Sequence, residues 1–178
     1  MFYVVTGGSG SGKSEYAEQL ICEIGKNEAR YYIATMQAND AESRRRIKRH
    51  RSMRADKRFV TIECYRNLQK LSVTEKGVVL LECMSNLVAN EMFAADTADA
   101  EAADRAAQAE DKILRGIKNI KKQAMHLVVV TNEIFSDGVH YDPWTRAYQK
   151  CLAAVNNKMA GQADHVIEVV YGQVCTLK

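Results

Sequence analysis

The sequence has little of what disordered, secreted or membrane-spanning chains require. Its single proline and ordinary apolar fraction argue against a disordered or loop-rich chain. The five cysteines include no C-x-x-C pair, which argues against a zinc site or a disulfide framework. No apolar run reaches the length of a membrane span and no signal-like segment precedes the first strand, so we expect a cytoplasmic protein. At 178 residues, the chain fits one domain, residues 1–178, with a single core.

Strong net charge is also absent, because 25 Lys and Arg residues nearly balance 22 Asp and Glu residues, for a net charge of +3. No global basic field therefore suggests a dedicated nucleic-acid binder. Positive charge is concentrated locally, with nine cations between Arg44 and Arg58. Residues 40–53 have almost no apolar stripe, so we expect a charged surface helix, a candidate for a mobile lid or a ligand-gripping arm.

A glycine-rich segment follows the apolar residues 2–5 and precedes a helix-like stretch, which is the context of a phosphate-binding P-loop. The segment comprises Gly7, Gly8, Ser9, Gly10, Ser11, Gly12, Lys13 and Ser14. Its glycines let backbone N–H groups converge on a polyphosphate, and Lys13 adds a charge near the β and γ phosphates. Ser14 offers a hydroxyl to Mg²⁺, and the helix directs its positive end at the anion. We therefore expect a nucleoside triphosphate here; the alternative is a Gly/Ser-rich turn that binds nothing.

Apolar runs and helix-like segments alternate along the chain. Strands are expected at residues 2–5, 29–35, 59–64, 78–83, 127–131, 165–170 and 173–177, and helices at 13–25, 40–53, 84–93, 99–125 and 142–163. This order predicts an α/β fold of the P-loop (RecA-like) type, a mostly parallel sheet with helices on both faces and a C-terminal antiparallel hairpin. Gly25 is a candidate C-cap of the first helix. The strand ends should bring Thr35, Glu82 and residues 132–133 to the rim that carries the P-loop.

Two side chains could carry chemistry. Glu82 ends an apolar strand, where P-loop proteins keep an acidic residue that holds Mg²⁺, although a strand-end Glu can also cap a helix or pair with a lysine. His50 lies in the basic segment, where neighbouring positive charge should keep its imidazole neutral and able to act as a nucleophile. On a helix, Arg46, His50 and Arg54 share one face, which could bind a triphosphate while the imidazole attacks phosphorus. From composition alone, a solvated basic helix with an incidental His50 is the more common outcome of such a charge run.

Other polar side chains have weaker claims. Asn132 and Glu133 follow a buried strand. A carboxylate there could act as a base, bind a second substrate or only cap the loop. His126 and His165 begin strands, so we expect them to be structural.

With the P-loop, Glu82 and the basic helix together, the chain resembles the bifunctional adenosylcobinamide kinase/adenosylcobinamide-phosphate guanylyltransferase family of cobalamin biosynthesis, almost from end to end. The matching segments are residues 6–14, 32–35, 46–54, 61–63, 80–83, 130–133 and 163–164, together with Asn90, Phe93 and Asn156. The P-loop alone is unspecific, but R-I-x-x-H-R-x-x-R following Y-I-A-T is a narrow signature. This signature favours the interpretation of His50 as a nucleophile over that of an incidental residue on a solvated helix.

The resemblance implies two activities: phosphorylation of the aminopropanol hydroxyl of adenosylcobinamide, then transfer of GMP from GTP to that phosphate. His50 matches the histidine that is guanylylated in between, and Arg51 and Arg54 would neutralise phosphate charge. Mg²⁺ would be shared by Ser14 and Glu82, with GTP or ATP as phosphoryl donor. Further nucleotide contacts implied by the resemblance are Ala34, Thr35, Met36, Ser52, Met53 and Glu63. Family members look like homotrimers.

The chain departs from the family mainly in its last third. The family's N-E-V-G is Asn132-Glu133-Ile134-Phe135 here, and its F-R-D-x-x-G-x-x-N-Q is residues 148–157, YQKCLAAVNN, which lack the arginine and the aspartate. A guanylyltransferase that has lost the kinase half is therefore one alternative, and a small-molecule P-loop kinase in which His50 plays no part is another. A nucleotide-regulated RNA-binding module is a third, although the basic helix has no aromatic residues for base stacking.

Overall fold

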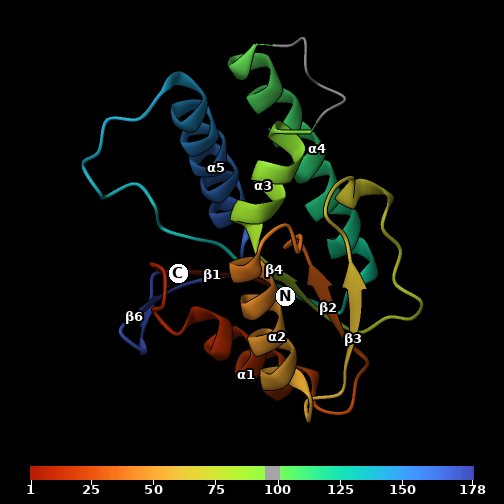
Figure 1. Ribbon diagram of the computed structural model, residues 1–178. Coiled ribbons are helices and arrows are strands. Elements are labelled where there is room, and N and C mark those ends of the chain that lie inside the picture. The colour runs from red at the N-terminus through yellow and green to blue at the C-terminus, as the bar shows by residue number, and fades with distance from the viewer. Residues whose placement is uncertain (95–100) are drawn as a thin grey trace.

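A computed structural model describes residues 1–94 and 101–178, whose strands form a single sheet (Figure 1). The strands are β1 (Phe2–Thr6), β2 (Arg30–Ala34), β3 (Phe59–Glu63), β4 (Val78–Glu82), β5 (His126–Val130), β6 (His165–Val170) and β7 (Gln173–Thr176). They lie in the order β3-β2-β4-β5-β1-β6-β7. Strands β1 to β6 run parallel and β7 pairs antiparallel with β6, which confirms the predicted sheet and its closing hairpin.

Helices cover both faces of this sheet (Figure 1). The helices of the described residues are α1 (Lys13–Gly25), α2 (Ala41–Arg54), α3 (Met84–Met92), α4 (Ala102–Gln123) and α5 (Pro143–Gln162), with one 3-10 turn, η1 (Leu68–Lys70). α1 and α2 lie on one face, and α3, α4 and α5 cover the other. The predicted start of α4, at Asp99, lies outside the described residues. None of these helices combines the length and the apolar character that crossing a bilayer requires.

Alternate strand residues divide between the two faces, as the period of a β-strand requires. Tyr32 packs with Leu80 in the cluster beneath α1, whereas Tyr31 and Ile33 pack with Leu81 beneath α3, α4 and α5. All of β4 is buried, because helices cover both faces of a parallel sheet. The continuous apolar run of this strand therefore predicted its central position correctly.

Gly25 ends α1, but it does not supply the left-handed cap that the sequence suggested. The positive φ, 39°, belongs to the next residue, Lys26. Gly25 instead lies against Val78 at the start of β4, where a Cβ atom would be 2.7 Å from a Val78 methyl carbon. The glycine permits close packing of helix on strand, a role that one sequence does not distinguish from capping.

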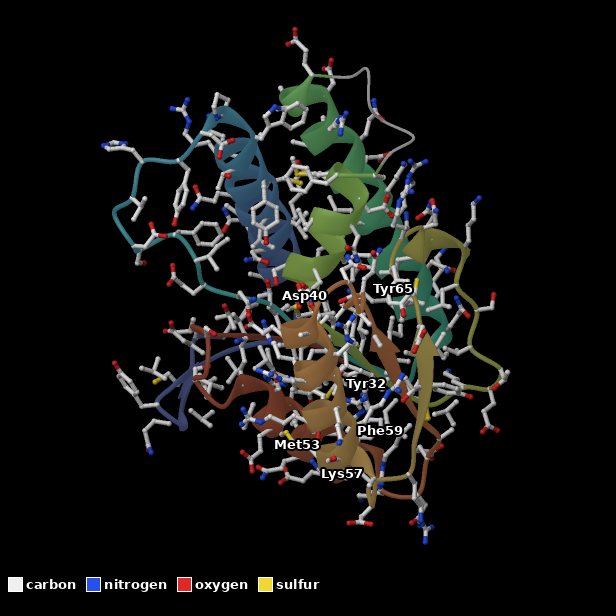
Figure 2. The ribbon with its side chains drawn as sticks, in the orientation of Figure 1. Tyr32, Asp40, Met53, Lys57, Phe59 and Tyr65 are labelled. Carbon is white, nitrogen blue, oxygen red and sulfur yellow. The ribbon has the colours of Figure 1, made fainter. Side chains whose placement is uncertain are left out.

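α2 differs from the other helices because almost all of its side chains are polar. Asp40 caps its N-terminus, and the Asp40 carboxylate accepts a hydrogen bond from the Ser43 N–H at 2.7 Å. In this fully described helix only Arg54 is buried, so the prediction of a surface helix is correct for every turn but the last. Figure 2 shows α2 running from Asp40 to Met53, with Lys57 just beyond its end. Its mobility stays a prediction.

Candidate active site

The P-loop joins β1 to α1 through backbone conformations that glycine adopts most readily. Gly7, Gly10 and Gly12 have φ values of 154°, 72° and 94°. A Cβ atom on Gly7 would lie 2.4 Å from the carbonyl oxygen of Val169. Gly12 is also the N-cap of α1, so the positive end of this helix begins at the loop.

Lys13 lies inside the loop. Its ammonium group donates a hydrogen bond to the carbonyl oxygen of Gly8 at 2.9 Å, and the residue is buried. Burial lowers the pKa of Lys13, against an opposing effect of Cys83 and Glu82. An amine and a helix N-terminus thus converge at the place where a P-loop binds polyphosphate.

A cavity of about 660 Å³, its open mouth included, lies between α1, α2 and the ends of β2, β3 and β4. The residues assigned to the site from sequence that line it are Lys13, Ser14, Ala34, Met36, His50, Arg51, Arg54, Glu63 and Glu82. The fold therefore brings residues from both helices and from three strands to one place. This is the rim that the strand order predicted.

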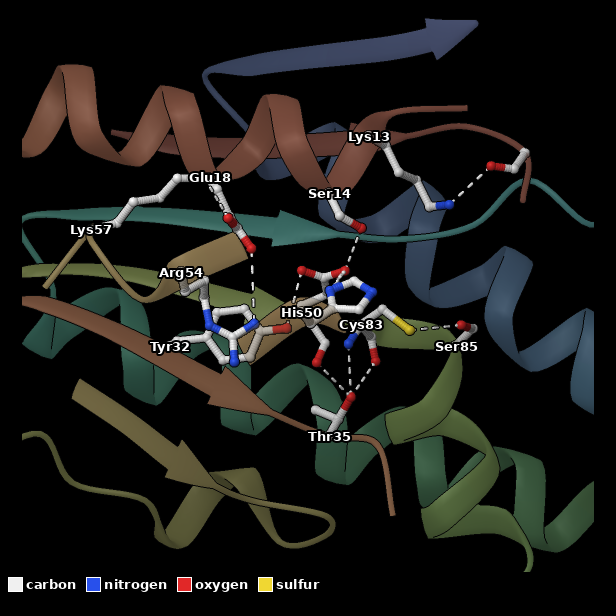
Figure 3. A network of polar contacts seen from close by, with 12 residues as sticks. Lys13, Ser14, Glu18, Tyr32, Thr35, His50, Arg54, Lys57, Cys83 and Ser85 are labelled. Atoms are coloured by element: carbon white, nitrogen blue, oxygen red, sulfur yellow. Dashed lines mark hydrogen bonds and ion pairs between the residues drawn. The ribbon is translucent and has the colours of Figure 1, made fainter. Parts of the chain in front are cut away.

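Other residues assigned from sequence do not line the cavity. Thr35 is buried beneath it, where its Oγ1 accepts a hydrogen bond from the Cys83 N–H at 2.7 Å and ties the end of β2 to that of β4 (Figure 3). Ser52 is exposed on a groove at the other side of α2, because a residue two positions after His50 points away from it. Met53 and the P-loop residues 7–12 do not border the cavity either.

Glu82, the last residue of β4, links the P-loop to its neighbours (Figure 3). Its Oε1 accepts a hydrogen bond from the Ser14 hydroxyl, and its Oε2 accepts one from the Tyr32 hydroxyl at 3.2 Å. A carboxylate and a hydroxyl side by side are hard oxygen donors of the kind that Mg²⁺ takes. These two residues therefore fit the ion. Among the described residues, Glu82 neither caps a helix nor pairs with a lysine.

His50 points from α2 toward Glu82. Its Nδ1 lies 3.5 Å from Oε1 of Glu82, and its side chain is 21% exposed. Within the described part of the chain this nitrogen has no hydrogen-bond partner. Arg46 and Arg54 line the same cavity, which confirms that these three residues share a face. A ring proton on Nδ1, facing the carboxylate, would leave the lone pair of Nε2 for attack.

Arg51 and Glu63 pair with each other at the edge of the cavity, with 3.0 Å between Nη2 and Oε1. Glu63 also accepts a hydrogen bond from the Tyr65 hydroxyl at 2.7 Å. Both members of the ion pair are largely exposed, at 60% and 48%. Because such pairs contribute only about 0–1 kcal/mol, either side chain can turn to a ligand at little cost.

Several residues at the site were not assigned to it from the sequence. Tyr32, Ile47, Thr61, Cys83 and Asn86 line the cavity, and Glu18 and Lys57 lie beside Arg54. Glu18 on α1 is fully buried, with its Oε2 2.6 Å from the Lys57 ammonium and its Oε1 3.8 Å from Arg54. The guanidinium carbon of Arg54 lies 3.4 Å from the centroid of the Tyr32 ring. Burial raises the pKa of Glu18, and its hydrogen bond to Lys57 opposes this effect. The sequence contained a signal for Glu18, because its position places it on the buried face of α1 near Ile21. An unpaired carboxylate is costly there, so Glu18 needed a cationic partner.

The residues that follow β5 have different roles. Asn132 lines the cavity, and its amide donates a hydrogen bond to the Ser85 hydroxyl at 2.7 Å. Glu133 accepts hydrogen bonds from the Phe135 N–H and the Ser136 hydroxyl, both at 2.9 Å. Of the alternatives that the sequence left open for Glu133, the structure therefore shows the loop cap.

A mostly parallel sheet with a P-loop before α1, and with a carboxylate beside the P-loop serine, defines a P-loop nucleotide-binding fold. An ATPase from the type III secretion system of pathogenic bacteria shares this fold, with a TM-score of 0.61 and 10% identity over 94% of this chain and 50% of that one. The flagellar accessory protein FlaH from Methanocaldococcus jannaschii shares it with a TM-score of 0.52 and 13% identity, over 99% and 77%. At these identities the likeness shows the fold alone.

The chain belongs to the cobinamide kinase/cobinamide phosphate guanyltransferase family, whose family model matches residues 3–177. It is 35% identical to the bifunctional adenosylcobalamin biosynthesis protein CobU of Salmonella typhimurium and 34% identical to that of Escherichia coli. Each match covers 97% of this chain and 97% of the relative. The family resemblance inferred from the sequence is therefore confirmed.

Proposed function

We propose that this protein acts in cobalamin biosynthesis, where it phosphorylates adenosylcobinamide and then transfers GMP from GTP to adenosylcobinamide phosphate through a guanylylated His50. The observation that carries the proposal is that His50 shares one cavity with Lys13, Ser14 and Glu82. Family membership and the bifunctional relatives in Salmonella and Escherichia coli support the pair of activities.

In guanylyl transfer, a nitrogen of His50 attacks the α-phosphorus of GTP. A nitrogen–phosphorus bond forms while the bond to the pyrophosphate oxygen breaks, and pyrophosphate leaves. An oxygen of cobinamide phosphate then displaces the imidazole, which gives adenosyl-GDP-cobinamide and restores His50. Because Nδ1 faces Glu82, we assign the attack to Nε2.

Cationic side chains around the cavity would bind and orient the phosphates. Lys13, Arg46 and Arg54 line it directly, and Arg51 would join them by leaving Glu63. Ser14 and Glu82 would hold Mg²⁺, which when bound neutralises phosphate charge. The remaining nucleotide contacts would be the P-loop backbone, Ala34 and Met36.

The kinase step would use the same P-loop, with GTP or ATP as the donor. Within the segment that departs from the family, Asn156 accepts a hydrogen bond from the Thr131 hydroxyl at 2.7 Å and so still supports the end of β5 beside Glu82. A second candidate function is a guanylyltransferase without kinase activity. It is favoured by residues 149–150, which are Gln and Lys where the resemblance expects Arg and Asp.

Mass analysis of the products separates these functions. Supplied with adenosylcobinamide, GTP, ATP and Mg²⁺, the protein should form first the phosphate and then adenosyl-GDP-cobinamide. His50→Ala should accumulate the phosphate alone, whereas His140→Ala, an exposed histidine outside the cavity, should match the wild type. Adenosyl-GDP-cobinamide formation by His50→Ala would contradict the proposal, and GMP transfer only to supplied cobinamide phosphate would select the second candidate.

We also propose a homotrimer located in the cytoplasm. The antiparallel edge strand β7 is exposed along its length, with Val174 and the following Leu177 open to contact by a second copy. All five cysteines are free thiols, as a reducing compartment such as the cytoplasm favours.

The proposed trimer is tested by light scattering, which should give the mass of three chains. The mass of one chain would contradict the assembly.

A further inference from the structure

We propose that Glu18 is a positioning residue for His50. Its buried carboxylate holds the last turn of α2 against α1 and thereby keeps His50 beside Glu82. This inference rests on the proposed role of His50 as the nucleophile.

The place of α2 depends on polar contacts. Arg54 is the only buried residue of this fully described helix, so α2 has no apolar face of the kind that positions a surface helix. The ion pair of Arg51 with Glu63 is open to solvent on both sides, where such pairs contribute little. The buried contacts at the last turn are therefore the ones that can fix the helix.

Glu18 pairs with two cations at the end of α2, Arg54 in the last turn and Lys57 just beyond it (Figure 3). Its carboxylate is 2.6 Å from the Lys57 ammonium and 3.8 Å from Nη1 of Arg54. Lys57 lies three residues after the end of α2, and its N–H donates a hydrogen bond to the Arg54 carbonyl oxygen at 3.0 Å, so both cations belong to one stretch of backbone. Because the carboxylate is fully buried, water does not replace these partners when they are removed.

The same turn is connected to Glu82 through Tyr32. Arg54 lies over the Tyr32 ring, whose hydroxyl donates a hydrogen bond to Glu82 at 3.2 Å. His50 precedes Arg54 by one helical turn, so a shift of the last turn moves the imidazole with it.

Glu18, His50 and Glu82 each offer one atom within 4.8 Å of the others, a spacing that could also suit a metal ion. Lys57 and Arg54 already neutralise Glu18, and a divalent cation would have to displace or face both. We therefore assign Glu18 to positioning and not to metal binding.

The Glu18→Gln variant keeps the shape of the side chain and removes its charge. The rate at which GMP is transferred from α-labelled GTP to the chain should fall about tenfold or more. The KM for GTP should rise by a smaller factor, because Arg54 loses its buried partner while Lys13 and the P-loop are untouched. Backbone hydrogen exchange across residues 41–54 should accelerate. Glu23→Gln, on the exposed side of α1, is the matched control and should change neither quantity.

Two changes at Lys57 separate positioning from general stability. Lys57→Arg retains the cation and should keep the wild-type rate, whereas Lys57→Met should reproduce the Glu18→Gln defect, with a fall in rate that is larger than the rise in KM. Wild-type labelling and wild-type exchange in both Glu18→Gln and Lys57→Met would overturn the inference; if Glu18→Gln does not fold, Lys57→Met decides. Absence of label on the wild-type chain would instead contradict the proposed function, and hydrogen exchange would then still decide whether Glu18 anchors α2.

Discussion

Glu82 contacts side chains from three different elements. Ser14 of α1 and Tyr32 of β2 donate hydrogen bonds to it, and His50 of α2 faces it at 3.5 Å. Because the three neighbours belong to different elements, the packing of these elements sets the spacing between the P-loop and the imidazole before a ligand binds. Such preorganisation places a nucleophile where a phosphate would bind.

Gly7 is the P-loop residue with the least room for a side chain. In Gly7→Ala the new Cβ would lie 2.4 Å from the Val169 carbonyl oxygen at a φ of 154°, so the loop must shift. We expect the free energy of unfolding to fall by about 1–3 kcal/mol and GTP binding to weaken about tenfold or more, measured by chemical denaturation and calorimetry. Gly161→Ala in α5, where a Cβ has open space, should leave GTP binding unchanged and should not lower the free energy of unfolding, because alanine favours a helix more than glycine does. Wild-type GTP affinity in Gly7→Ala would contradict the described loop conformation.

Elements differ in how well the sequence predicted them. α1, α3, α4 and α5 bury apolar side chains against the sheet, and all four were predicted, α1 and α4 from the helical spacing of their apolar residues. α2 has no such period, and its anchor Glu18 contacts a lysine 39 residues further along the chain. Tyr32 contacts Glu82 across 50 residues. A local pattern can mark Glu18 as buried but does not show which residues pair over such separations, which explains why neither contact was predicted.

The start of α5 gives a test at the scale of one helix. Asp142 accepts hydrogen bonds from the Thr145 hydroxyl and the backbone N–H groups of Thr145 and Trp144, which hold its pKa below the usual 3.8. The cap is therefore complete above pH 3.8 and is lost as the pH falls through the lowered pKa.

We expect Asp142→Ala to lower the melting temperature at neutral pH by about 2–4 °C. Asp142→Asn is the matched control, since asparagine caps a helix without titrating; it should keep most of the stability and lose the acid dependence contributed by the cap. Thermal melts across the acid range measure both effects. Equal melting temperatures for the wild type and Asp142→Ala at neutral pH would show that the cap does not stabilise α5.

At the scale of the whole molecule, the parallel sheet places the P-loop and the end of β4 at one edge, and α2 lies over that edge. The alternation of strands and helices predicted this arrangement, and motifs predicted Ser14, His50 and Glu82. Gly25 and Ser52 show where the prediction was incomplete. Gly25 packs against β4 and Ser52 faces away from the cavity. Both placements depend on packing between elements, which one sequence does not show.

The covalent step is most directly tested with GTP labelled at the α-phosphate. The protein is incubated with labelled GTP and Mg²⁺ and separated under denaturing conditions after acid or alkaline treatment, with His50→Ala alongside. We expect label on the wild-type chain that survives alkali, is released by acid and is absent from His50→Ala. A folded, GTP-binding chain that takes up no label, or label that persists in His50→Ala, would contradict the proposal that His50 carries the GMP.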